Sequence, residues 1–186
     1  MATAELVRWR LDPLASDRRV FGERLLPLTS GLVRRLSAAL LRLPAGSRLR
    51  KAGLSRELKR GIAAGNRGDY ESQFAMCSPD VEFHMDYRDW VSVDLDPVYR
   101  GHAELRRLMD DMRSVWSEFR IQPREVVDAG GGRMACRVEV RGVGRQSGIG
   151  QAQEQWYALI MERGLLVRQH VVKTEDEALA ALRTRY

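Results

Sequence analysis

The sequence has few cysteines and no long apolar run. Its two cysteines, Cys77 and Cys136, lie far apart and have no metal-ligand spacing, so we expect reduced, partly buried thiols and no disulfide framework. A membrane-spanning helix needs about 20 apolar residues, and no apolar run approaches that length. The first 16 residues are interrupted by charged side chains and hold no apolar signal core. We therefore expect a cytoplasmic protein.

Lysine is also scarce, with only three among the 31 basic residues. Residues 1–67 carry 15 basic and 5 acidic side chains, whereas residues 68–186 carry 16 and 20. Arginine predominates in both parts, which favours a coding bias over a surface selected for nucleic acid. Trp9 and Phe21 are the only aromatic residues among 1–67, and no nucleic-acid-binding motif accompanies them. We expect no nucleic-acid partner.

Sequence signatures of several common catalytic sites are missing. The run Gly130–Gly132 lies between two predicted strands, so it offers no helix N-terminus to a phosphate. No G-x-S-x-G motif is present for a serine hydrolase. The three histidines, His84, His102 and His170, have no local ligand spacing, and His102 is expected at a helix start. We expect neither a metal nor a cofactor.

Residues 1–50 form a basic helical extension that Pro13, Pro27 and Pro44 divide into short pieces. Residues 31–43 predict one amphipathic helix, because apolar side chains recur there at helical spacing with arginines beside them. Such a helix could lie on an anionic membrane surface. We favour the alternative, in which its apolar stripe packs on the main domain or on a second subunit.

Residues 51–186 predict one compact domain. Apolar residues recur at helical spacing in some segments and alternate in others. We expect helices over 55–65, 69–77, 102–117 and 174–182, the last opened by a capping box. We expect strands over 81–85, 119–128, 134–140, 151–161 and 165–173. Helices followed by a run of antiparallel strands are typical of an α+β fold rather than a parallel doubly wound sheet.

Four segments, in this order, resemble a known family. They are "RGIAAGNRGDYESQFAMCSPDVEFH", "VYRGHAELRRL", "RGVGRQSG" and "LLVRQHVVKTEDEALAAL". Together they resemble the SnoaL-like domain, a branch of the nuclear-transport-factor-two-like superfamily that also holds the ketosteroid isomerases. The resemblance covers about residues 55–186. It implies a cystatin-like roll, in which a strongly curved antiparallel sheet surrounds a pocket and helices close its wide end, and a homodimer formed through the sheet.

The resemblance also implies where catalytic side chains lie. Ketosteroid isomerases place an aspartate base near the end of the first strand, after a Val-Glu pair, whereas here that pair is followed by Phe83 and His84. Strand alternation puts His84 and Asp86 on one face, and His170 lies in the middle of strand 165–173. We hypothesise that His84, Asp86 and His170 supply the acid and the base. The alternative is that the histidines are hydrogen-bonded in the core or face solvent.

Large aromatic side chains are the expected substrate contacts. The candidates near the expected pocket are Phe83, Trp90, Tyr99, Trp116, Phe119 and Tyr157. Tyr99 or Tyr157 could donate a hydrogen bond to a carbonyl oxygen. Trp90 lies in a charged, irregular stretch and could cover the pocket as a lid. For each of these residues, packing in the core is the alternative.

Two functions stay open from the sequence. The first is a cofactor-independent acid–base enzyme of the isomerase, cyclase, dehydratase or epoxide-hydrolase type, acting on a small apolar molecule. The second is a non-catalytic module that binds a ligand or mediates dimerisation, with the basic extension supplying contacts. Ionisable residues expected in the pocket favour the first function, while the missing aspartate and the long extension favour the second.

Overall fold

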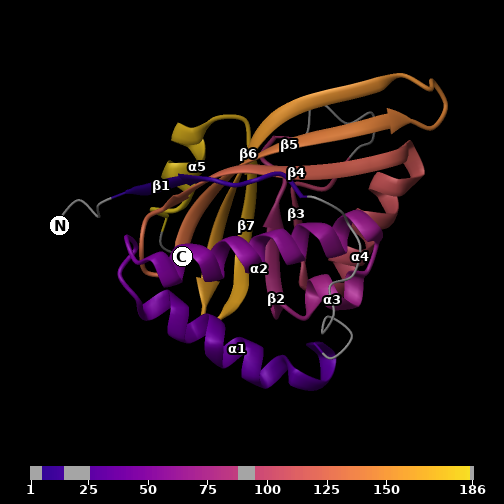
Figure 1. Cartoon of the computed structure of the whole chain (residues 1–186). Coiled ribbons are helices and arrows are strands. Elements are labelled where there is room, and N and C mark those ends of the chain that lie inside the picture. The colour runs from indigo at the N-terminus through magenta and orange to yellow at the C-terminus, as the bar shows by residue number, and fades with distance from the viewer. Residues whose placement is uncertain (1–5, 15–25, 88–94, 185–186) are drawn as a thin grey trace.

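A computed structural model describes residues 6–14, 26–87 and 95–184 of the chain. These residues form one curved sheet that does not close on itself, together with five helices (Figure 1). The strands are β1 (Val7–Arg10), β2 (Cys77–His84), β3 (Val98–Arg100), β4 (Trp116–Asp128), β5 (Arg133–Gly144), β6 (Gly150–Glu162) and β7 (Leu165–Val172). The helices are α1 (Leu26–Arg42), α2 (Arg48–Arg67), α3 (Tyr70–Phe74), α4 (Gly101–Val115) and α5 (Glu175–Ala181).

The sheet is an antiparallel meander with one parallel pair, in the order β1-β4-β5-β6-β7-β2-β3. Strands β4 to β7 pair antiparallel in sequence order. Strand β7 then pairs parallel with β2, and this register places His84 directly beside His170. Strands β1 and β3 add short antiparallel edges. The architecture confirms the predicted α+β class and the predicted curved sheet.

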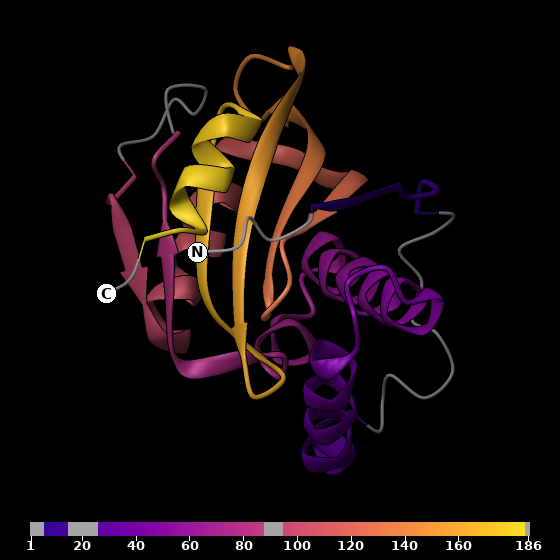
Figure 2. The ribbon, with the colours of Figure 1, turned by 90° about the vertical axis from the view of Figure 1, so that its left-hand side faces the viewer.

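Helices cover both faces of the sheet. Helices α2 and α4 pack on the face that carries the larger apolar core, which we call the inner face. Helix α5 packs on the opposite, outer face over β5, β6 and β7, where a smaller core lies (Figure 2). Alternation decides the side of each residue: Tyr157 belongs to the inner core and its neighbour Ala158 to the outer one.

Local signals in the sequence explain where the helices start and stop. The hydroxyl of Ser47 accepts a hydrogen bond from the backbone amide of Arg50 at the start of α2, and Gly68, with a φ of 70°, ends that helix. Thr174 and Glu177 form the predicted capping box of α5. The boundary predicted between residues 50 and 51 falls inside α2 (Arg48–Arg67). Residues 48–50 of the predicted extension therefore belong to the same helix as the start of the predicted domain.

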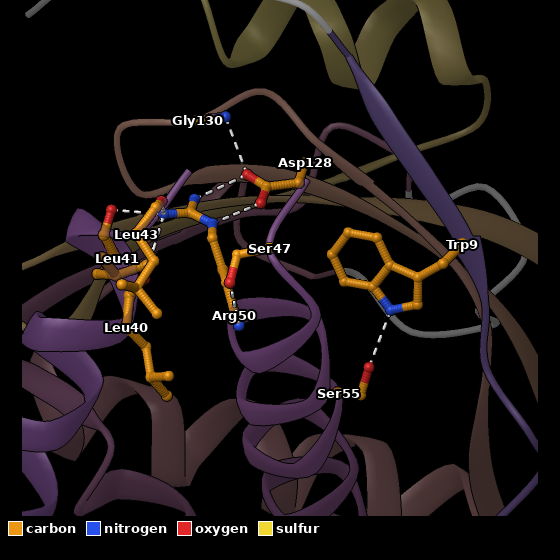
Figure 3. A network of polar contacts seen from close by, with 9 residues as sticks. All are labelled: Trp9, Leu40, Leu41, Leu43, Ser47, Arg50, Ser55, Asp128 and Gly130. Carbon is orange, nitrogen blue, oxygen red and sulfur yellow. Dashed lines mark hydrogen bonds and ion pairs between the residues drawn. The ribbon is translucent and has the colours of Figure 1, made fainter. Parts of the chain in front are cut away.

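A buried ion pair ties the extension to the sheet (Figure 3). Arg50 donates through Nε and Nη2 to the two carboxylate oxygens of Asp128 at 2.6 and 2.8 Å, and both side chains are almost fully buried. The remaining nitrogen, Nη1, donates to the carbonyl oxygens of Leu40, Leu41 and Leu43. One guanidinium therefore joins the C-terminal end of α1 to the end of β4.

The first described residues are also fixed to the domain. Residues Val7–Arg10 pair with the last part of β4, and the indole nitrogen of Trp9 donates to Ser55 Oγ on α2 at 2.9 Å (Figure 3). The N-terminal region thus contributes a strand, which its proline-interrupted sequence did not predict, and a helix.

Helix α1 packs on the domain along one side only. Ser37 is buried, and Gly164, with a φ of 81°, approaches α1 so closely that a Cβ there would lie 2.2 Å from the Arg34 carbonyl oxygen. On the other side, Leu32 and Leu36 are 60% and 57% exposed. Within the apolar stripe, Val33 lines the cavity of the main domain and Leu40 lies against Gly53 of α2, so the expected packing on the main domain is found for part of the stripe. None of the described helices combines the length and apolar character needed to cross a bilayer.

Both cysteine thiols are buried and unbridged. Burial raises the pKa of Cys77 to about 12 and raises the pKa of Cys136 above its ordinary value. Because the thiolate is the reactive form, we expect a thiol reagent to label neither cysteine in the native protein in the time that fully labels urea-unfolded protein. Mass spectrometry of the labelled chain measures this, and fast native labelling of either residue would contradict the burial.

Candidate functional site

A cavity of about 700 Å³ lies between the inner face of the sheet and the helices that cover it. Its wall is mostly apolar and includes Leu54, Leu58, Ile62, Leu108, Met109, Met112, Met134, Leu159, Met161 and Val171. Helix α1 adds Val33, Arg34 and Ser37 to this wall. The extension thus forms part of the cavity rather than standing apart from it.

Four of the six aromatic residues expected at a substrate site line this cavity, namely Phe83, Trp116, Phe119 and Tyr157. Tyr99 does not line it. The Tyr99 side chain is buried in the core, and its hydroxyl accepts a hydrogen bond from the backbone amide of Asp96 at 3.0 Å. Trp90, the expected lid, lies outside the described residues.

Glu57 is a half-buried carboxyl in the cavity wall. It lies on α2, and Ser37 of α1 donates a hydrogen bond to its Oε1. Burial raises the pKa of Glu57 above its ordinary value, while the Ser37 hydrogen bond and the positive charge of Arg60 offset part of that rise. Glu118, the other carboxyl among the described wall residues, is exposed. Glu57 is therefore the wall residue best suited to take up and return a proton.

A chain of side-chain hydrogen bonds runs along β6 to Tyr157. The Tyr87 hydroxyl donates to Gln153 at 3.3 Å, Gln153 donates to Gln155 at 3.3 Å, and Gln155 donates to the Tyr157 hydroxyl oxygen at 3.1 Å. Because that oxygen accepts, the Tyr157 hydroxyl can still donate its proton, and Tyr157 lines the cavity. Burial raises the pKa of Tyr157, so its hydroxyl stays neutral and keeps the proton. This is the arrangement of a neutral donor for a developing oxyanion.

Gln73 adds an unpaired acceptor to the wall. Its Oε1 is buried and has no hydrogen-bond partner among the described residues. A buried polar atom left unpaired costs about 1–3 kcal/mol, which a donor on a ligand would recover. Asn66, also in the wall, differs because its Oδ1 and Nδ2 both bond to the backbone of Ile121. Asn66 therefore holds α2 to β4.

The predicted acid–base residues lie on the other side of the sheet. Phe83 and Val171 face the cavity, so alternation sends His84, Asp86 and His170 to the outer face. The expectation that these three residues line the cavity is therefore corrected. The apolar members of each alternating pair occupy the inside, as the hydrophobic effect requires.

The three residues nevertheless lie together. His170 Nδ1 is 2.7 Å from Asp86 Oδ2, and the rings of His84 and His170 stack with centroids 4.3 Å apart. His84 Nε2 is 3.2 Å from Glu82 Oε2, which also accepts from Arg168 Nε at 3.0 Å. Burial lowers the pKa of His170, and its hydrogen bond to Asp86 opposes this shift. A catalytic role for these residues stays a prediction.

Sequence reasoning missed Glu57, Gln73 and Gln155. The signal for Glu57 was an acidic residue directly before Leu58, within the apolar stripe of the helix predicted to cover the pocket. Nothing comparable marks Gln73 or Gln155, because their roles depend on tertiary contacts that join separate elements.

The chain was compared with known proteins. A family model described as a SnoaL-like domain matches residues 58–183, and no curated protein matches the chain significantly. Among solved structures, TerC co-crystallised with polyporic acid is 17% identical with a TM-score of 0.57, over 69% of this chain and 97% of that one. An NTF2-like protein from Burkholderia pseudomallei is 19% identical with a TM-score of 0.57, over 69% and 96%.

A third similar structure is a Bacillus subtilis protein provisionally described as an isomerase, which is 17% identical with a TM-score of 0.52, over 67% of this chain and 91% of that one. At these identities the likeness shows the fold, which is the one the resemblance implied. The family model covers well over half of the chain, including the sheet from β2 to β7, helix α5 and most of the cavity wall. The chain therefore belongs to the SnoaL-like domain family.

Proposed function

We propose that the protein is an acid–base enzyme that removes a proton from the carbon beside a carbonyl group of a small, largely apolar ligand held in the cavity. Glu57 is the general base and Tyr157 is the donor to the carbonyl oxygen. The observation that carries the proposal is a half-buried carboxyl with a raised pKa in the wall of an apolar cavity. The same wall presents a neutral hydroxyl whose oxygen already accepts a hydrogen bond.

The step balances within these two groups. The Glu57 carboxylate takes the proton, and the electron pair of the broken C–H bond passes into the carbonyl system to give an enolate. The Tyr157 hydroxyl stabilises the enolate oxygen by a hydrogen bond. Returning the proton from Glu57 to a different carbon gives an isomer. Alternatively, the enolate carbon attacks a second carbonyl of the same ligand and closes a ring, and the alkoxide formed from that carbonyl takes the proton from Glu57. Isomerase and cyclase chemistry both begin with this step.

The cavity supports a ligand of intermediate size. A volume of about 700 Å³ lies within the range of sites for drug-sized molecules. Its aromatic and aliphatic walls favour a flat or fused-ring body, and the unpaired Gln73 oxygen favours a hydroxyl or amine on one edge. TerC, which shares the fold, was crystallised with polyporic acid, so this compound is a reasonable first probe.

The non-catalytic alternative uses the same cavity without proton transfer. The observation in its favour is that His84, Asp86 and His170, the acid–base residues predicted from the sequence, do not line the cavity. The homodimer and the cytoplasmic location expected from the sequence stay predictions for either function.

Proton abstraction can be tested without knowing the product. We expect the protein, incubated in D₂O with a panel of apolar cyclic and aromatic ketones, to speed deuterium uptake beside the carbonyl, as measured by mass spectrometry. Quenching of tyrosine and tryptophan fluorescence by the same compounds and by polyporic acid measures binding. Binding without exchange would leave the non-catalytic alternative, and the absence of both would refute the ligand site.

A further inference from the structure

Two histidines and an aspartate meet on the outer face of the sheet, away from the cavity. His84 on β2 and His170 on β7 are direct neighbours across the parallel ladder. Asp86 follows His84 by two residues, so it projects to the same face. One ligand atom from each residue lies within 4.8 Å of the other two. The pairing of β2 with β7 thus assembles a group that no local spacing in the sequence could reveal.

These three side chains are a recognised type of ligand set. Two imidazole nitrogens and one carboxylate oxygen suit first-row divalent transition metals such as Zn²⁺, Co²⁺ and Fe²⁺. His170 is only 6% exposed, so its ring is held in place by packing. The Asp86 side chain is 49% exposed, which leaves a path for an ion from solvent and room for water at its other positions.

Glu82 lies behind His84 and holds its ring in an orientation suited to metal binding. His84 Nε2 lies 3.2 Å from Glu82 Oε2, which leaves His84 Nδ1 for an ion. A carboxylate behind a ligating histidine fixes its tautomer and its orientation. Glu82 is itself held by Arg168 Nε at 3.0 Å and by Arg100 Nε at 3.3 Å. The two nearby arginines are therefore bonded to Glu82.

An ion would replace the hydrogen bond between His170 Nδ1 and Asp86 Oδ2, which lie 2.7 Å apart. The proton would pass to water, and the two atoms would move apart to about 3.3 Å, the spacing of two ligands bound at about 2.0–2.1 Å in a tetrahedral site; the half-exposed Asp86 side chain can make this movement. The rings of His84 and His170 stack with centroids 4.3 Å apart and planes inclined by 21°, which brings a nitrogen of each ring close to the Asp86 carboxylate.

We propose that His84, Asp86 and His170 bind one divalent transition-metal ion on the outer face, clamping β2 to β7. The site lies outside the cavity and uses none of the residues of the proposed proton transfer. It therefore stands or fails independently of that proposal.

The test uses the full chain, freed of any affinity tag and treated with a chelator. Co²⁺ is titrated while its visible absorption is followed, and Zn²⁺ is titrated by calorimetry and in competition with Co²⁺. We expect one ion per chain for each metal, with Zn²⁺ displacing Co²⁺. We expect His84→Ala, His170→Ala and Asp86→Asn each to lower the affinity by more than tenfold, and Glu82→Gln to lower it by about tenfold.

Matched controls separate a built site from adventitious binding. His102→Gln removes the third histidine, which stacks on Phe74 away from the proposed site. Asp80→Asn removes an exposed carboxyl from β2, the strand that carries His84. Neither should change the affinity by more than about twofold. Asp86 is half-exposed, so its variant should fold even if a histidine variant does not, and circular dichroism checks this. No saturable binding, or equal binding by wild type and Asp86→Asn, would overturn the site.

Discussion

Replacing Arg50 by methionine is expected to lower the free energy of unfolding by about 3–5 kcal/mol, because it leaves a buried carboxylate without its counter-ion. Asp128 is fully buried, and both of its oxygens are bonded to the Arg50 guanidinium. The variant also deprives three carbonyl oxygens at the end of α1 of their donor. Urea unfolding followed by circular dichroism measures the loss as a lower midpoint.

Two further variants identify the cause of the loss. Arg48→Met, at an exposed position in the first turn of the same helix, should change the stability by no more than about 0.5 kcal/mol. Arg50→Met combined with Asp128→Leu should recover part of the loss, since the unpaired charge is then gone. A loss below about 1 kcal/mol for Arg50→Met alone would contradict the role given to this pair.

Most strands and helices that the sequence predicted carry a signal of their own, either a long apolar run or a capping motif. Strands β4 to β7 span 8 to 13 residues each and carry alternating or continuous apolar residues over much of that length, and α5 carries its capping box in the sequence. Strands β1 and β3 span only four and three residues, too few for a period to show. They exist because β4 and β2 offer unpaired backbone groups to them.

The face of the sheet on which a side chain lies was harder to predict than the position of the strand in the sequence. Alternation correctly groups His84 with Asp86, but it does not say which group faces inward. The apolar neighbours settle this, since Val81, Phe83 and Met85 are all buried in the inner core and so take the cavity side. Because these three apolar residues alternate with His84 and Asp86 along the chain, their burial places His84 and Asp86 on the outer face.

Arg50 and Glu57 show a second limit of the sequence. Both lie in a basic helical segment whose charged residues are ordinarily solvated. Arg50 is buried because Asp128, 78 residues away in the chain, meets it, and Glu57 is half-buried because α1 folds back over it. The partners of both residues are fixed by the tertiary fold, so the sequence marks Glu57 only by its place beside Leu58 in the apolar stripe and does not mark Arg50 at all.

Replacing Glu57 by glutamine is expected to slow ketone deuterium exchange by about 10²–10⁴-fold, because the amide cannot accept the proton. Tyr157→Phe should slow exchange by about 10²-fold through the loss of the oxyanion donor. Glu118→Gln changes an exposed carboxyl of the same wall and should cost less than about tenfold. Exchange by Glu57→Gln at the wild-type rate would remove Glu57 as the base, and a large loss in His84→Gln or His170→Gln would return that role to the outer face.

The pH dependence distinguishes a base from a residue that only shapes the cavity. Glu57 acts in its ionised form, and burial raises its pKa, so the exchange rate should rise with pH through a midpoint above the ordinary pKa of glutamate. Ser37 donates to Glu57 and thereby lowers that pKa. Ser37→Ala should therefore move the midpoint to higher pH while leaving the plateau rate within about threefold. Because Ser37 belongs to α1, this shift would also show that α1 tunes the chemistry of a cavity whose wall comes mostly from residues 58–183, the part that matches the SnoaL-like domain.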